Sequence, residues 1–464
     1  MIGLLNKNII QKVFALFIFG VIILSSNRSV AQYDMGVYNL KAVPQTNLYN
    51  PALIPDYNMH FGFPALSSVY TGFGTNGAKY NQFFKKMPDD SLHFDFDGVL
   101  SNIKDENRIS ASARQEWLNF GVKWRKFYFS FSLADVSSVN QYYPKSLVSL
   151  VVEGNVIFIG ETVTLDPLSI KALHYREYAF GAAYDLNEKW NFGIKAKLLY
   201  GKSAINTEQM NFNLTTSEDY YYLDMETDFR INSSLPTGKK DTLNPVTFGE
   251  YSFSAWNMGV GFDVGATYRL DDKFSFSASV LDLGYIQFDR WIDNYYSDSK
   301  IHFEGIDFNQ FKGLDDDQRE KKIQEVKDSI LDLFELEDDA KKFIVPLTAK
   351  VYLGANYNMS DVDNVGALLR MAIYKGKIIP AFSLSYFRQL NKNIGVTANY
   401  TITNRSYSNI GVGVVATFEP VQVYFSTDNL YGVIFPDDTR YTNFHFGINF
   451  IIPGTKVFRP MIDL

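Results

Sequence analysis

Residues 443–450 read Asn-Phe-His-Phe-Gly-Ile-Asn-Phe, and this short stretch decides the fold class. Apolar side chains occupy every second position, and polar residues or glycine stand between them. A period of two is the repeat of a β-strand whose two faces meet different surroundings. The stretch predicts a strand with Phe444, Phe446, Ile448 and Phe450 on one face and Asn443, His445, Gly447 and Asn449 on the other.

The same alternation recurs along most of the chain. In residues 118–133 two alternating runs meet at Arg125 and Lys126, and in residues 258–280 they meet at Asp271 and Asp272. Short polar turns of this kind join antiparallel strands. The pattern predicts an all-β fold, a transmembrane antiparallel β-barrel of about fourteen strands within 58–452. The expected strands are 58–73, 116–124, 127–136, 174–186, 189–201, 251–270, 273–288, 345–358, 364–374, 377–389, 393–404, 408–418, 420–431 and 441–452.

The lengths of the connections support this strand count. If the chain enters from the periplasm, connections after even-numbered strands should be short turns, and they are. Every long insertion follows an odd-numbered strand, which predicts long extracellular loops at 74–115, 137–173, 202–250 and 289–344. A wrong count would break this parity.

The N-terminus is expected to be a cleaved signal peptide, residues 1–31. Lys7 and Lys12 precede an apolar run from Val13 to Leu24, and Ser29 and Ala31 provide a small-x-small cleavage site. A run this short is unlike a transmembrane helix, which needs about 20 residues, although an uncut signal anchor is the alternative. The mature chain would begin at Gln32 and be exported to the outer membrane of a Gram-negative bacterium.

Composition agrees with a barrel and excludes other classes. Aromatic residues make up 16% of the chain while the mean hydropathy is only -0.13, as expected where lipid-facing and lumen-facing residues alternate. Without a cysteine there is no disulfide and no lipid-modified cysteine. Loss of Lys7, Lys12 and Arg28 with the leader would change the net charge from -7 to -10. An acidic protein of this kind is not expected to bind nucleic acid.

The last long insertion is predicted to carry a helix near 307–343. From Asp316 to Leu336 the apolar residues follow helical spacing, with charged residues on the opposite face. The helix could pack on other loops or bind a partner. Residues 453–464 form an expected C-terminal tail.

No catalytic, metal-binding or cofactor-binding constellation is visible. The five histidines are scattered at positions 60, 93, 174, 302 and 445, and Asp315 to Asp317 lack the spacing of a calcium loop. Gly72, Gly74 and Gly77 match the dinucleotide fingerprint literally, but the strand and helix context that the fingerprint needs is absent. The chain is therefore not expected to be an enzyme.

Charged residues sort to one face of the expected strands. By alternation this face points into the lumen, where charge is tolerated, rather than to lipid, where it is costly. These charges could pair with one another or with a plug, or they could select solutes. They are Lys123, Lys195, Lys197, Asp263, Arg269, Lys350, Arg370 and Asp428, together with Glu177 and Asp185.

One local motif lies between the leader and the first strand: residues 49–55 read Tyr-Asn-Pro-Ala-Leu-Ile-Pro. An Asn-Pro-Ala segment followed by a barrel of this size resembles the FadL-like superfamily of outer-membrane barrels. The whole mature chain looks like a Bacteroidota-type outer-membrane barrel family that carries a domain-of-unknown-function label. This resemblance implies that residues 32–57 fold inward as a hatch containing Asn50, Pro51, Ala52 and Leu53. A connector stiffened by proline would explain the same residues.

The resemblance implies two functions. FadL-like members include diffusion transporters of hydrophobic small molecules, and barrels that act as partners of protein-secretion machinery. The first hypothesis is therefore a channel or transporter for a small hydrophobic substrate. The second is a non-transporting scaffold whose loops bind cell-envelope proteins. An apolar pocket continuous with a gap in the wall would favour transport, whereas a fully packed lumen with ordered loops would favour the partner role.

Overall fold

A computed structural model describes residues 35–40, 42–87, 91–219, 222–236, 247–304, 315–374, 376–403 and 405–453. The expected signal peptide at 1–31 lies outside these ranges, as does the expected tail at 453–464 apart from its first residue.

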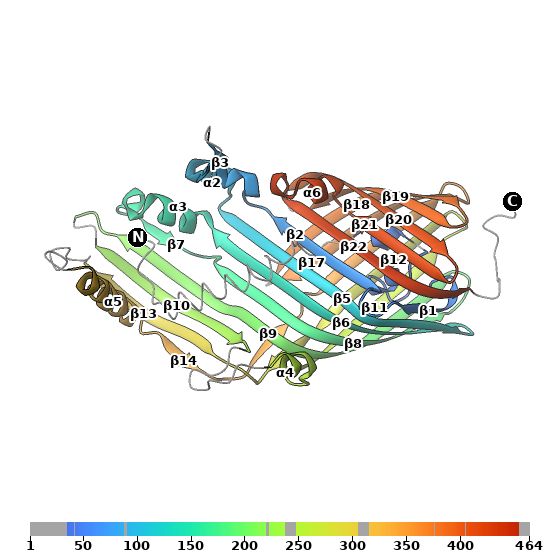
Figure 1. The fold of residues 1–464 in the computed structure, drawn as a ribbon, viewed down its shortest axis with the longest axis horizontal. Coiled ribbons are helices and arrows are strands. Elements are labelled where there is room, and N and C mark those ends of the chain that lie inside the picture. The colour runs from blue at the N-terminus through green and yellow to red at the C-terminus, as the bar shows by residue number, and fades with distance from the viewer. Residues whose placement is uncertain are drawn as a thin grey trace.

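Fourteen antiparallel strands form one closed barrel, as predicted (Figure 1). The first and the eighth are each interrupted and consist of two consecutive segments. In chain order the wall contains β1 Tyr57–Gly62 with β2 Ser68–Thr75, β5 Glu106–Trp124, β6 Phe127–Pro144, β8 Ser169–Asp185, β9 Trp190–Thr216, β11 Met258–Arg269, β12 Phe274–Phe288, β15 Phe343–Pro346 with β16 Lys350–Asn358, β17 Asp363–Tyr374, β18 Lys377–Asn391, β19 Ile394–Thr403, β20 Ser406–Phe418, β21 Val421–Thr427 and β22 Tyr441–Pro453. Pairing of β22 with β1 and β2 closes the barrel.

The remaining elements lie in the connections or in the N-terminal segment. The additional strands are β3 Phe84–Lys86, β4 Leu92–Phe94, β7 Thr162–Thr164, β10 Leu223–Ser234, β13 Asn294–Phe303 and β14 Glu337–Asp339. The α-helices are α2 Phe96–Asn102, α3 Lys145–Glu153, α4 Phe248–Phe253, α5 Asp316–Asp332 and α6 Leu430–Ile434. The 3-10 helices are η1 Val37–Asn39, η2 Pro44–Leu48, η3 Tyr80–Gln82, η4 Asn155–Phe158 and η6 Pro436–Asp438.

The two ends of the barrel differ. Counted along the wall, every second strand is followed by a short connection, and these connections meet at one end, here called the short-turn end. They are β5–β6, β8–β9, β11–β12, β16–β17, β18–β19 and β20–β21. The connections that contain helices and extra strands meet at the other, the long-loop end (Figure 1). There β9 continues past the barrel and pairs with β10, which pairs with β13, so that a sheet extends beyond the wall.

Alternation along the strands separates an outer from an inner surface. On β6, Phe127 and Phe129 are exposed while Tyr128 between them is 1% exposed. The same holds on β12, where Phe274 and Phe276 are exposed. The outward apolar side chains form the band that a lipid bilayer requires, so the chain is an outer-membrane type of barrel.

Several predicted strands begin, end or continue differently in the structure. The strands predicted at 116–124, 127–136 and 189–201 are longer, the one at 345–358 is interrupted at 347–349, and the one at 420–431 ends at Thr427. The prediction of an unbroken strand over 58–73 is wrong because residues 63–67 interrupt it with a local bulge, where Pro64 lacks an amide donor and Ala65 has a φ of 62°. The wall stays sealed at this bulge. Phe63 N donates to Ile448 O at 2.8 Å, and Ala65 N donates to Trp117 O at 3.0 Å.

The sixth strand begins at Met258, so the prediction that it starts at residue 251 is also wrong. Residues 248–253 form α4 instead, because Thr247 and Glu250 make a capping box: Thr247 Oγ1 accepts from Glu250 N, and Thr247 N donates to Glu250 Oε2. The expected helix within 307–343 is α5, which ends at Asp332 rather than Leu336. Residues 305–314 of that insertion lie outside the described ranges.

Candidate functional site

The N-terminal segment, residues 35–40 and 42–56, lies inside the barrel (Figure 1). It contacts inward-facing side chains from opposite sides of the wall. Tyr38 Oη lies 2.7 Å from Ser277 Oγ on β12, within hydrogen-bond distance, and Gln45 Nε2 donates to Asn449 Oδ1 on β22 at 2.8 Å. The segment therefore bridges the lumen and fills much of it.

The residues of the expected hatch motif make specific contacts with the wall. Asn50 is 0% exposed, and its Nδ2 donates to the carbonyl oxygens of Ala266 on β11 and Ala278 on β12, both at 3.3 Å. Its Oδ1 accepts from Ala52 N at 2.9 Å, which fixes the turn. Leu53 packs against a buried apolar cluster that includes Leu281 on β12 and Tyr352 on the neighbouring strand β16.

Two glycines let the segment approach the wall this closely. A Cβ on Gly193 would lie 2.3 Å from the carbonyl carbon of Pro51, and a Cβ on Gly265 would lie 2.1 Å from Asn50 Oδ1. Real Cβ atoms do not come so close to main-chain atoms, so glycine at position 193 is a requirement of the docked segment.

Charged side chains of the lumen hold the segment at two further points. Lys195 Nζ on β9 donates to Asn47 O at 2.7 Å. Asp428, which follows β21, accepts from Met35 N at 3.0 Å through Oδ2. Both contacts involve an ionised group and a main-chain atom, and such hydrogen bonds are stronger than neutral ones.

Beside the segment, a buried ionic network crosses the lumen. At its centre Lys197 Nζ lies 2.6 Å from Asp282 Oδ1, 2.8 Å from Asp263 Oδ1 and 3.5 Å from Glu177 Oε2. All four side chains are nearly excluded from solvent. One lysine surrounded by three carboxylates needs further cations to balance the charge.

Those cations are on both sides of the centre. Arg114 Nη2 lies 2.9 Å from Glu177 Oε1 and 3.5 Å from Glu116 Oε1. On the other side, Lys350 Nζ lies 2.5 Å from Asp282 Oδ2. The network thus joins β5, β8, β9, β11, β12 and β16, strands that are far apart in the sequence.

The charges expected to face the lumen divide into groups. Four of them come together at or beside the network: Lys195, Lys197, Asp263 and Lys350. Arg370 lines the same region, buried, with its Nε donating to Tyr352 Oη at 3.2 Å. Asp428 holds the start of the N-terminal segment. Lys123 and Arg269 lie near the strand ends at the short-turn end, apart from the network.

The sequence pattern did not identify three further charged residues of the lumen: Asp282, Arg114 and Glu116. Simple alternation places Asp282 on the lipid face with Phe274 and Phe276, but a register shift between Phe262 and Val264 on the neighbouring strand turns it inward. Its φ of 59° marks the bulge. An aspartate on a lipid-facing position was itself a signal of a bulge, because charge is costly there. Arg114 was missed because the strand was expected to begin at residue 116 instead of 106.

A small cavity of about 110 Å³ remains between the network and the N-terminal segment. Leu48 and Tyr49 of the segment form part of its lining, opposite charged side chains of the network. Tyr175 on β8 also lines it and belongs to the apolar layer that follows towards the long-loop end.

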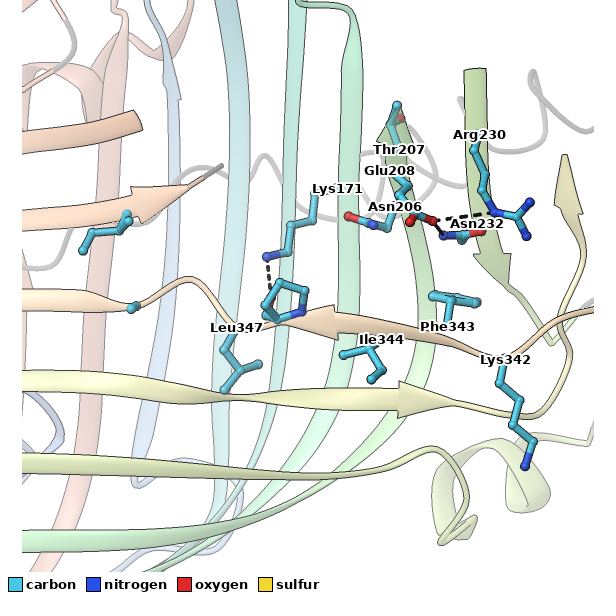
Figure 2. A pocket seen from close by; sticks show the side chains of 13 residues that line it. Lys171, Asn206, Thr207, Glu208, Arg230, Asn232, Lys342, Phe343, Ile344 and Leu347 are labelled. Carbon is cyan, nitrogen blue, oxygen red and sulfur yellow. Dashed lines mark hydrogen bonds and ion pairs between the residues drawn. The ribbon is translucent and has the colours of Figure 1, made fainter. Parts of the chain in front are cut away.

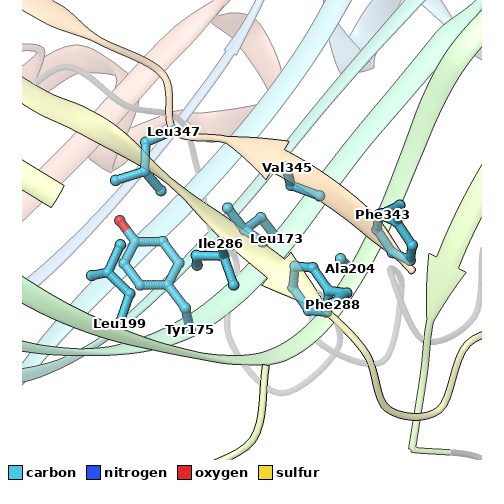
Figure 3. Close-up of a cluster of buried hydrophobic side chains, with 9 residues drawn as sticks. All are labelled: Leu173, Tyr175, Leu199, Ala204, Ile286, Phe288, Phe343, Val345 and Leu347. Carbon is cyan, nitrogen blue, oxygen red and sulfur yellow. The ribbon is translucent and has the colours of Figure 1, made fainter. Parts of the chain in front are cut away.

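That layer is a cluster of buried apolar side chains (Figure 3). The rings of Phe288 and Phe343 stack with centroids 5.2 Å apart. The cluster consists of Leu173, Tyr175, Leu199, Ala204, Ile286, Phe288, Phe343, Val345 and Leu347, contributed by β8, β9, β12 and β15 and by the residue after β15. It separates the ionic network from the barrel mouth.

The mouth contains a larger cavity of about 680 Å³ (Figure 2). Phe343 and Leu347 of the apolar cluster form part of its lining, together with Ile344 and Ile373. Polar and charged side chains complete it, among them Lys171, whose Nζ donates to Pro346 O at 2.6 Å. From the mouth inwards the lumen therefore presents a mixed cavity, an apolar layer, an ionic layer and the N-terminal segment.

Comparison with known families identifies the barrel. A family model described as a family of unknown function, DUF5723, matches residues 51–428, which is most of the chain. The chain belongs to the DUF5723 family. The comparison with curated proteins found no match.

The DUF5723 barrel also has a fold similar to solved outer-membrane barrels. One is the Ralstonia pickettii toluene transporter TbuX, with a TM-score of 0.42, 10% identity and coverage of 88% of this chain and 94% of that one. Another is the P. putida toluene transporter TodX, with a TM-score of 0.40, 11% identity and coverage of 88% of this chain and 93% of that one. A third is a Pseudomonas aeruginosa FadL homologue, with a TM-score of 0.39, 10% identity and coverage of 88% of this chain and 94% of that one. These likenesses concern the fold alone.

A serine and a histidine do meet in the lumen of the DUF5723 barrel, although the sequence did not reveal the pair. Ser68 Oγ lies 2.7 Å from His445 Nε2, and Tyr424 Oη lies 3.0 Å from the same nitrogen. Ser68 is 0% exposed, so its hydroxyl is closed off from solvent. The contact links β2, β21 and β22, and we interpret it as structural.

Two absences concern only the described part of the chain. No group of three or more histidine, aspartate or glutamate residues there is arranged to hold a metal ion. No helix in those ranges combines the length and apolar character needed to cross a membrane.

Proposed function

We propose that this protein is a plugged outer-membrane channel that admits a small hydrophobic solute at its long-loop end. The observation that carries the proposal is the succession of layers in the lumen. Phe343 and Leu347 belong both to the mouth cavity and to the apolar cluster, so a solute in the cavity would contact apolar side chains directly. Cavities of this size with apolar walls and a few polar groups are typical of small-molecule sites.

Passage beyond the apolar cluster would require the N-terminal segment to move. Within the described residues, a cavity of about 110 Å³ lies between the ionic network and the N-terminal segment. The segment is held by hydrogen bonds such as those of Lys195 and Asn50, which can be exchanged for bonds to water. A plug held in this way can be displaced without unfolding the wall.

Conductance in planar bilayers tests the plug. Gly193→Ala introduces a methyl group at the position where Pro51 approaches, so the segment should be forced from its seat and the conductance should rise at least severalfold. Gly261→Ala is the matched control on the next strand, because its nearest neighbour would be a side-chain atom of Leu347 at 3.4 Å. Equal, low conductance of both variants would contradict the plugged channel.

Binding of an uncharged apolar fluorophore, N-phenyl-1-naphthylamine, tests the solute class. Saturable binding to the barrel in nanodiscs should weaken at least tenfold in Phe343→Asp, which places a charge between the mouth cavity and the apolar cluster. Lys342→Asp changes the neighbouring residue on the cavity rim and should have a smaller effect. Binding that neither variant changes would exclude the mouth cavity as the site.

A second candidate is a scaffold that binds a cell-envelope protein through its loops. Apolar side chains are exposed on the connections β2–β5 and β6–β8, including Tyr80, Phe96, Val151 and Val156, of which Val156 is 67% exposed. Large exposed apolar groups on ordered loops are typical of interaction surfaces. A photoreactive residue at Phe96 that crosslinks one defined envelope protein in cells, with no change of conductance in Gly193→Ala, would favour this role.

A further inference from the structure

We infer that α6 is part of the membrane-facing wall and that its exposed side contacts the acyl chains of the leaflet on the long-loop side. This inference does not depend on the proposed channel. β21 has only seven residues, whereas β20 and β22 each have thirteen. A strand tilted by about 45° needs about 9 to 11 residues to cross the apolar band of a bilayer.

The short strand leaves a notch in the wall. β21 ends at Thr427, which pairs with Val412, while β20 continues to Ser406. Across the notch, β22 continues from His445, the partner of Ser426, to Tyr441. Lipid cannot satisfy open strand edges, so another element must cover this part of the wall.

α6 occupies that position and contacts both β20 and β22. Asn429 caps the helix by accepting from Gly432 N at 3.1 Å, and its Nδ2 donates to Tyr441 O at 2.6 Å. A Cβ on Gly432 would lie 2.7 Å from Tyr441 O and 3.0 Å from Thr442 Cβ. The helix therefore lies flush against β22, and only a glycine fits at the contact.

The opposite side of α6 is apolar and exposed. Ile434 is 60% exposed, Phe435 after the helix is 50% exposed, and Tyr431 and Val433 are also exposed. No residue between 430 and 435 is charged. This surface continues the outward apolar face of the wall, which passes through Phe425 on β21 below it. Continuity with the lipid-facing wall identifies the bilayer as the occupant.

Polar contacts mark where the apolar surface ends. Tyr431 Oη donates to Asp438 Oδ2 at 2.6 Å, and Lys79 Nζ lies 2.9 Å from Asp438 Oδ1. A tyrosine with its ring on an apolar surface and its hydroxyl on a charged group is typical of the boundary between bilayer and water. The boundary on this side therefore lies between α6 and η6.

Site-directed fluorescence tests the inference directly, because the chain has no cysteine. Ile434→Cys is labelled with an environment-sensitive nitrobenzoxadiazole and compared with Val156→Cys, an apolar position of similar exposure on η4 in another loop. Both variants are reconstituted in phosphatidylcholine vesicles, and both must keep the heat-modifiable gel mobility of a folded barrel. Lipids with a spin label on the acyl chain should quench the label at 434 at least threefold more than the label at 156.

Iodide in the aqueous phase should give the opposite order. Equal iodide quenching at both positions, without quenching by the spin-labelled lipids, would overturn the inference and place α6 in water. A label at 434 that neither quencher reaches would also overturn it, because another protein surface, such as a second copy of the chain, would then cover the helix.

Discussion

Lys197 Nζ and Asp282 Oδ1 lie 2.6 Å apart in the centre of the lumen, although strict alternation along β12 would place Asp282 in lipid. The bulge at this residue points the carboxylate into the lumen. There Asp282 Oδ2 also lies 2.5 Å from Lys350 Nζ. One local irregularity therefore completes a network that joins wall strands from β5 to β16.

Removing this carboxylate should destabilise the barrel strongly. Asp282→Asn leaves Lys197 and Lys350 without the charge that compensates them, and breaking a buried ion pair in this way costs about 3 to 5 kcal/mol. The midpoint of guanidinium unfolding in detergent, followed by tryptophan fluorescence, should fall accordingly. Asp272→Asn, in the exposed turn before β12, should leave it unchanged. If Asp282→Asn combined with Lys350→Gln loses as much as the two single changes added together, the two side chains are not coupled.

The faces of β12 should respond differently to an arginine. Phe276→Arg places the charge in lipid and costs roughly 2 to 4 kcal/mol near the bilayer midplane, whereas Ser275→Arg places it in the lumen near the short-turn end. Ser277 is unsuitable as the control because its hydroxyl contacts Tyr38. Heat-modifiable barrel in outer-membrane fractions should decrease much more for Phe276→Arg. Equal losses would contradict the face assignment of this strand.

The hydrogen bond from Lys195 to Asn47 should keep the N-terminal segment closed. A hydrogen bond to a charged group contributes about 1.5 to 3 kcal/mol, so Lys195→Met should raise amide exchange in residues 43–53 by about tenfold or more. Hydrogen exchange with mass spectrometry measures this effect. Lys202→Met is the control, because this buried lysine on the same strand donates to the main-chain oxygens of Ser252 and Ser254 and not to the segment. Unchanged exchange in both variants would show that this bond does not hold the segment.

Amide exchange should depend on pH in the sheet that β9, β10 and β13 form beyond the wall. His302 Nδ1 donates a hydrogen bond to Asp224 Oδ1, which raises the pKa of His302 above its ordinary value of 6.5, and the two residues are paired across β10 and β13. A raised histidine pKa stabilises the pair fully at low pH, below the unfolded value, and this contribution is lost as the pH rises through the folded value. Exchange in residues 222–230, corrected for the intrinsic rate, should therefore increase from pH 6 to pH 8. The increase should be absent in His302→Gln.

The sequence by itself determined the class and the topology of this protein. A period of two needs only neighbouring residues, so Phe444, Phe446 and Ile448 show the outward face without any knowledge of their partners. The strand number and the parity of the turns followed from the same local pattern. The charges on the inner face could be predicted one strand at a time, as for Lys195, Lys197 and Asp263.

Only the tertiary structure decided what those inner side chains contact. A bulge of one residue reverses the alternation after it. Neither the bulge at Asp282 nor the interruption after Gly62 changes the sequence of apolar residues enough for that sequence to predict it. Lys197 meets Asp282 because β11 pairs with both β9 and β12, and Gly193 meets Pro51 because the N-terminal segment docks inside the barrel. Contacts between strands that are distant in sequence depend on closure and register, which local periodicity does not contain.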